Sequence, residues 1–240
     1  MTSTEKVEFS GLAALRGRKE QRAKAQEERD RPKATWFTIK SGETLTVRFL
    51  QELDESSPNY NSANGVYLGL VERQAHGKNG FLSRALDTTE IDPEGRDFAA
   101  EMYKKTKEAG WKRRENFYIN VAVDRGDGKP SVEILSRNLH SPFIDDLGDE
   151  NDAHENSITN ATYTITRRGA GTDTVWKLRE SKTELDVDGL ELWDLDTHAK
   201  RHIPYENQKE WYLKNYTPDK REEDEDPVDG SDASDQVPAW

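Results

Sequence analysis

The sequence predicts a mainly β protein with minor α content: a small Greek-key barrel with helical insertions, a flexible basic N-terminal arm and a disordered acidic C-terminal tail. Short segments of alternating apolar and polar residues recur along the middle of the chain, and glycine-containing turns join two pairs of them. One helical pattern falls between them. Because 32% of the 240 residues are hydrophobic while 34% are charged, we expect one core of moderate size.

The first clear strand covers residues 44–50. Its apolar residues Leu45, Val47 and Phe49 alternate with polar ones, so we expect these three side chains to face the core. A polar loop then leads to a second apolar run over residues 66–71, which we expect to be another strand.

A helix is predicted over residues 92–109, opened by Asp92-Pro93, because proline is well tolerated in a first helical turn. Residues 116–124 carry the strongest strand pattern, and an Asp-Gly turn joins them to residues 131–135. A short helix is predicted over residues 142–147, followed by an acidic loop.

A second hairpin is predicted to pair residues 162–168 with residues 174–179. Residues 185–216 are predicted to be irregular, with scattered apolar anchors. Five or more short strands, with one helix between the middle ones, favour a barrel of the OB type. An open α+β sheet is the alternative.

The two ends of the chain are predicted to lie outside a core domain of residues 35–217. Residues 1–34 form a basic arm, in which the pattern over 10–33 predicts a polar helix with eight bases and four acids between Arg16 and Lys33. Residues 218–240 form the tail, and its last part, residues 222–240, has eight acidic residues and no base. The tail is too polar to fold alone, so we expect it to be disordered.

The sequence gives no specific sign of catalysis, a cofactor or a metal. Cysteine is absent, which excludes thiolate metal sites and cysteine nucleophiles. The loop 184–189 has the start of a calcium loop but Leu195 at its twelfth position, and the pair His198 and His202 lacks the glutamate of a zinc motif. With no signal core and no apolar run long enough for a membrane span, we expect a soluble, cytoplasmic protein.

The dominant pattern is the mixture of basic and aromatic residues in three stretches of the chain. Such surfaces bind single-stranded nucleic acid, because cations follow the phosphates and exposed rings stack on bases. The candidate DNA-binding residues are Trp36, Lys40, Arg48, Trp111, Lys112, Arg113, Arg114, Tyr118, Tyr163, Arg167, Arg168, Trp176, Lys177 and Arg179.

The alternative is that many of these rings belong to the core. Phe117 alternates in phase with Ile119 and Val121, so we expect it to be buried, whereas Tyr118 is out of phase and is the better stacking candidate. The pattern leaves Trp176 open between the two roles. Trp36, Tyr118 and Trp176 are the rings that we expect to stack.

The order of these features resembles that of phage-type single-stranded-DNA-binding proteins of the helix-destabilising class. A basic arm precedes the strand 43–50, a basic-aromatic stretch over 111–114 leads into the strand 116–123, and the hairpin 165–174 and an acidic tail follow. The tip, with Asp235, Val237, Pro238 and Trp240, is similar to the acidic ends of bacterial SSB proteins.

This resemblance implies an OB-fold that coats single-stranded DNA in replication and recombination. The arm would contact a neighbouring protomer or DNA, and the tail would recruit replication and recombination proteins and gate the groove. The location would be the host cytoplasm if a phage encodes the chain. Relatives often carry a Cys/His zinc ribbon, but the corresponding stretch, residues 76–110, has no cysteine, so zinc is not carried over.

Two other hypotheses remain at this point. The chain could be a replisome or virion interaction module without a nucleic-acid role, or a metal-dependent enzyme that uses its acidic clusters.

Overall fold

The computed structural model describes residues 16–20, 22, 33–76, 82–126, 128–169, 173–214 and 216. The chain divides into two compact units, residues 1–34 and 35–240. In the first unit, residues 16–20 are helical and lie within the helix predicted over residues 10–33. The tail predicted over residues 218–240 lies outside the described residues, and its separation from a core domain stays a prediction.

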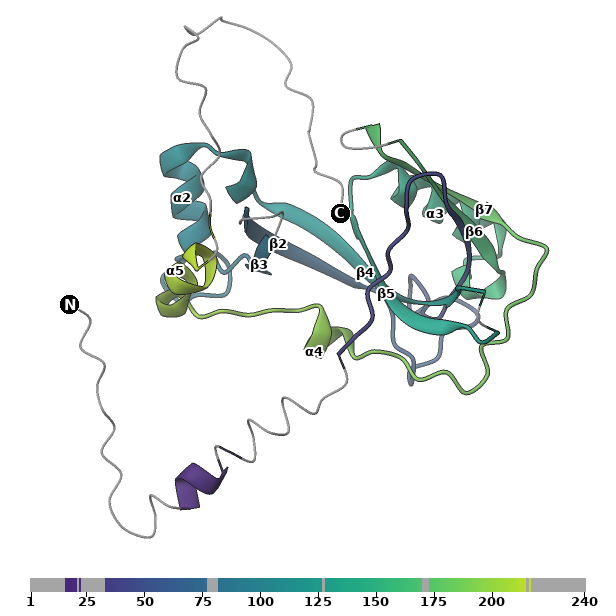
Figure 1. Cartoon of the computed structure of the whole chain (residues 1–240), viewed down its shortest axis with the longest axis horizontal. Coiled ribbons are helices and arrows are strands. Elements are labelled where there is room, and N and C mark those ends of the chain that lie inside the picture. The colour runs from purple at the N-terminus through teal and green to yellow at the C-terminus, as the bar shows by residue number, and fades with distance from the viewer. Residues whose placement is uncertain are drawn as a thin grey trace, which may run out of the picture. The chain divides into compact units, whose positions relative to one another are not determined.

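The second unit is mainly β with a few helices (Figure 1). The strands are β1 (Thr44–Phe49), β2 (Leu68–His76), β3 (Leu82–Leu86), β4 (Arg114–Asp124), β5 (Ser131–Asn138), β6 (Tyr163–Arg168) and β7 (Val175–Glu180). The helices are α2 (Phe98–Thr106), η2 (Ala109–Trp111), α3 (Pro142–Ala153), η3 (Ile158–Asn160), α4 (Leu195–His198) and α5 (Tyr205–Leu213).

Within the described ranges, the seven strands form one antiparallel sheet that does not close into a barrel. Its order is β3-β2-β4-β1-β6-β7, and β5 pairs with β4. The first residues of β4 pair with β2, its last ones with β1, and β5 pairs along residues 116–123. Because β5 follows β4 over most of its length, β2 and β1 share the other edge of β4, and the sheet divides there into two arms.

Helices cover each arm (Figure 1). Helices α2 and α5 lie against β2 and β3, and α3 packs on β7. The main core lies in the β1–β6–β7 arm, where Leu45, Val47 and Phe49 are 8%, 0% and 1% exposed, which confirms the alternation predicted for this strand. A smaller cluster under α2 and α5 contains Ala75, Ala85, Ala99, Trp111 and Tyr212.

The predicted helix over residues 92–109 is longer than the helix observed. Helix α2 begins only after Asp97, whose carboxylate accepts a hydrogen bond from Ala100 N–H. Asp92 instead accepts hydrogen bonds from Glu94 N–H and Arg96 N–H, which holds residues 92–96 in a turn. The prediction that Asp92-Pro93 opens the helix was therefore wrong.

Further elements differ from the prediction. Helix α3 continues through the stretch predicted to be an acidic loop, and β3, α4 and α5 were not predicted at all. Strand β3 has five residues and an arginine at its centre, so its apolar pattern is too short to identify from sequence.

Candidate nucleic-acid interface

The sheet is open between β5 and the β6–β7 hairpin, and the chain before β1 crosses this opening. Ile134 N–H donates to Thr35 O at 2.8 Å, and Phe37 N–H donates to Ile134 O at 2.9 Å. Further along, Gly42 N–H donates to Arg167 O of β6 at 2.8 Å. The segment therefore contacts β5 at one end and β6 at the other, and it forms one wall of a pocket.

This pocket has a volume of about 380 Å³. Its walls come from segment 36–39, β2, β3, β4, β5, the β6–β7 hairpin, and the end of α4 with the residues after it. We call it the arginine pocket, because four arginines among the described residues line it, together with two tryptophans and one buried carboxylate. These residues are Arg84, Arg137, Arg167, Arg201, Trp36, Trp176 and Glu72.

Arg137 is the most unusual cation of the arginine pocket. Its guanidinium lies over the Trp176 ring, with the guanidinium carbon 4.2 Å from the ring centroid. Burial, together with the positive charge of Arg167, lowers the pKa of Arg137 to about 10. Two cations thus lie close enough to destabilise one another.

Two buried donors in the pocket have no acceptor. Within the part of the chain that the structure describes, neither Arg137 Nε nor Thr174 Oγ1 has a hydrogen-bond partner. An unpaired buried donor costs roughly 1–3 kcal/mol, and more when the group is charged. Both residues belong to the lining of the arginine pocket.

Glu72 forms the other side of the pocket, in a buried polar network. Its Oε2 accepts hydrogen bonds from Tyr118 OH at 2.6 Å and from Asn116 Nδ2 at 2.7 Å, while Arg84 Nη1 donates to Tyr118 OH at 2.9 Å. Burial raises the pKa of the Glu72 carboxyl, and the charge of Arg84 partly offsets this. Burial also raises the pKa of Tyr118.

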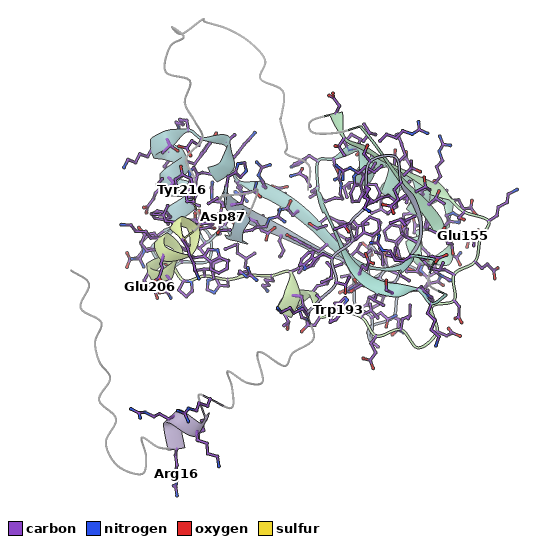
Figure 2. All side chains as sticks on the ribbon, viewed as in Figure 1. Arg16, Asp87, Glu155, Trp193, Glu206 and Tyr216 are labelled. Atoms are coloured by element: carbon purple, nitrogen blue, oxygen red, sulfur yellow. The ribbon has the colours of Figure 1, made fainter. Side chains whose placement is uncertain are left out.

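The residues after β7 bring Arg201 to the pocket. Trp193 lies beside the β4–β5 hairpin (Figure 2), where its Nε1–H donates to Val132 O at 2.9 Å and its backbone pairs with the Asn120 side chain. Further along, Leu86 N–H of β3 donates to Arg201 O at 2.8 Å. These two anchors hold the segment that carries α4 against the sheet.

The three rings expected to stack differ in exposure. Trp36 is 42% exposed in the arginine pocket, as a stacking ring must be. Trp176 is 9% exposed, because Arg137 covers it and Phe37 and Phe143 contact it edge-on. Trp176 therefore supports Arg137 rather than offering a free face.

Tyr118 is buried, which corrects the expectation drawn from its phase. Tyr118 is 1% exposed and Phe117, which was correctly expected to be buried, is 2% exposed. Strand β4 is covered on both faces, so alternation along it does not separate inside from outside. Tyr118 touches Trp36 edge-on, with ring centroids 6.1 Å apart, and its hydroxyl is held by Glu72.

Two further candidate rings are also buried. Trp111 is 1% exposed in the cluster under α2 and α5, with its ring centroid 5.7 Å from that of Tyr212. Tyr163 is fully buried against Phe49. In these stretches the aromatic side chains pack in the core, while the basic side chains at neighbouring positions point away from it. Neither ring is available to a base.

The remaining candidate cations lie outside the arginine pocket. The pairing of Thr46 with Thr164, and of Thr164 with Arg179, places the even positions of β1 and β6 on the face away from the main core. That outer face carries Arg48, Arg168, Lys177 and Arg179, whereas Arg167 points into the pocket. Lys40, Lys112 and Arg113 are exposed elsewhere, and Arg114 is half-buried.

Sequence reasoning missed Arg84, Arg137, Arg201 and Glu72. Arg137 lies two residues beyond the predicted end of its strand, and the alternation of Ser131 to Leu135 could have been extended to include it. Arg84 belongs to the unpredicted β3, and Arg201 to a stretch predicted to be irregular. The residues predicted from sequence that do line the pocket are Trp36, Tyr118, Arg167 and Trp176.

No protein family, no curated protein and no solved structure matches this chain. The described residues contain no group of three or more His, Asp or Glu side chains placed to hold a metal ion. None of the helices that the structure describes has both the length and the apolar character that crossing a bilayer requires.

Proposed function

We propose that this protein binds single-stranded DNA without strong sequence preference, and that the arginine pocket is its main contact with the strand. One observation carries the proposal: an exposed tryptophan and four arginines line the same pocket, opposed by a single buried carboxylate. Cations for the phosphates and a ring for a base are the two components that sequence-tolerant binding of single strands requires.

The pocket favours a single strand over a duplex. A base must leave the helical stack before a ring inside a pocket can contact its face, and a single strand meets this condition at little cost. The chain as a whole is acidic, with a formal net charge of −12, so the attraction for phosphate is local.

The wider proposal is that the protein protects and organises single strands in replication and recombination. In it, the open sheet is an OB-type arrangement completed by segment 36–39, the arm of residues 1–34 supports self-association, and the acidic tail recruits partner proteins and gates the pocket. The contacts of segment 36–39 with β5, through Phe37 N–H, and with β6, through Ile39 O and Arg167, support the OB-type assignment.

The test is the affinity for a fluorescent oligonucleotide, measured by anisotropy with the same sequence as a single strand and as a duplex. We expect tighter binding of the single strand. The Trp36→Ala variant should weaken it by about 1–3 kcal/mol, which is roughly 5- to 150-fold. Ile91→Ala is the matched control, because Ile91 is 52% exposed but does not line the pocket, and it should bind normally.

Equal affinity for duplex and single strand, or an unchanged affinity in Trp36→Ala, would count against the proposal. Complete absence of binding would favour the alternative, an interaction module for replisome or virion proteins.

A further inference from the structure

We infer that the arginine pocket is a discrete site for one nucleotide, with a phosphate subsite formed by Arg137, Arg167 and Thr174 and a base subsite at Trp36. The inference rests on the proposed function. It adds that the pocket recognises a single nucleoside monophosphate without the rest of a strand. A continuous track of charge would not bind such a small ligand selectively.

The phosphate subsite follows from donors that lack an acceptor. Arg137 Nε and Thr174 Oγ1 are buried without a partner among the described residues, and both residues line the pocket. Arg167 contributes a second guanidinium, fixed by donation from Nη1 to Ile39 O at 2.8 Å. A phosphate supplies several acceptor oxygens and negative charge, which satisfies both requirements at once.

The position of Arg137 is fixed before a ligand arrives. Its guanidinium rests on Trp176, which Phe37 and Phe143 hold edge-on with ring centroids 5.5 and 5.8 Å away. A guanidinium that is already oriented loses little freedom when it binds an anion. Trp176 is therefore a positioning residue for Arg137.

The base subsite follows from the exposure of Trp36. Its ring is 42% exposed although it is anchored next to the backbone pairing with Ile134, and Tyr118 supports it edge-on. The pocket volume of about 380 Å³ lies within the range of roughly 300–1,000 Å³ that is usual for small-molecule sites. A single nucleotide is of a size that suits this volume.

Isothermal titration of the full chain with dTMP, thymidine and inorganic phosphate tests the inference. We expect dTMP to bind about tenfold or more tightly than either part alone, because only dTMP occupies both subsites. Arg137→Lys should weaken dTMP binding by about tenfold, since lysine can neither stack as a plane on Trp176 nor present two donors in a fork.

Two further variants distinguish the loss of a contact with the ligand from misfolding. Thr174→Val keeps the shape of the side chain, removes the hydroxyl, and should weaken dTMP and phosphate by the same factor, about three- to tenfold. Arg168→Lys makes the same chemical change as Arg137→Lys on the outer face, next to Arg167 in sequence, and should leave dTMP binding unchanged.

The outcomes separate this inference from the proposed function. If the oligonucleotide binds through Trp36 but dTMP does not bind, the one-nucleotide site is wrong and the function stands. If inorganic phosphate binds as tightly as dTMP, the site is a general anion site and the inference is also wrong. If dTMP binds, depends on Arg137 and displaces no bound oligonucleotide, a free nucleotide is the ligand of the pocket: the inference holds, and the pocket is not the contact with the strand that the proposed function requires.

Discussion

At the scale of single residues, the direction in which a side chain points decides its role more than the residue type does. Arg167 and Arg168 are adjacent and chemically identical, yet the first lines the arginine pocket and the second lies on the outer face. The alternation of a strand gives this difference only when one face of the strand is covered. Along β4 both faces are covered, and Tyr118 is buried for that reason.

Glu72 gives a prediction about pH at this scale. Burial raises the pKa of its carboxyl, so between the ordinary and the raised pKa the folded protein holds a proton that the unfolded chain has released. The contribution of Glu72 to the free energy of unfolding therefore falls as the pH rises through this window. Glu72→Gln keeps an acceptor for Tyr118 and Asn116 but has no charge to desolvate.

We expect Glu72→Gln to gain stability relative to the natural protein as the pH is raised from about 4 to about 7, by roughly 1 kcal/mol for each unit of the pKa shift. Urea unfolding at several pH values measures this difference, and Glu191→Gln, at an exposed position, is the control. A variant that is less stable by the same amount at every pH would show that the pKa of Glu72 is not shifted, because Arg84 and the two hydrogen bonds fully offset the cost of burial.

At the scale of elements, the β6–β7 hairpin controls the shape of the pocket. Gly169 has φ of +77°, and a Cβ added there would lie 2.1 Å from Asp173 O, so the turn must shift. Gly42 has φ of +83°, and no described atom outside its chain neighbours lies within 4 Å of its added Cβ. The two glycines therefore separate the cost of backbone conformation from the cost of a steric clash.

Gly42→Ala should cost about 1 kcal/mol of the free energy of unfolding, from its backbone conformation alone. Gly169→Ala should cost about 1–3 kcal/mol more, and it should also weaken dTMP binding, because Thr174 follows the shifted turn. Thermal and urea unfolding of both variants give the comparison. Equal costs would show that the turn relaxes freely around the added methyl group.

The elements also show which parts of the fold could be predicted. Strands β1, β4, β6 and β7 follow from alternation, since each has an apolar row with polar neighbours or a turn signal beside it. Strand β3 and helix α5 could not be found, because the first is short and the second owes its helical state to packing against β2 and β3.

At the scale of the whole molecule, the candidate site is a product of topology. Arg84, Arg137, Arg167 and Arg201 come from four separate parts of the chain, and only the branching of the sheet at β4 brings them to one opening. Local sequence patterns reached Arg167 and Trp36 but contain no information about how distant segments meet. To predict the site, the pairing of the strands would have had to be known; the residue types alone were not enough.

The dependence of DNA affinity on salt tests which surface the strand follows. Each phosphate neutralised on a single strand contributes about −0.7 to the slope of log affinity against log salt, so the one phosphate that the arginine pocket binds predicts a slope of about −0.7. Arg137→Gln should reduce that slope by about 0.7. Removing the outer-face charges of Arg168 and Arg179 together should leave it unchanged, because both point away from the pocket. A slope near −3, flattened by the outer-face variant but not by Arg137→Gln, would mean that the strand follows the outer face of β1, β6 and β7, where four candidate cations lie, and that the arginine pocket serves a separate ligand.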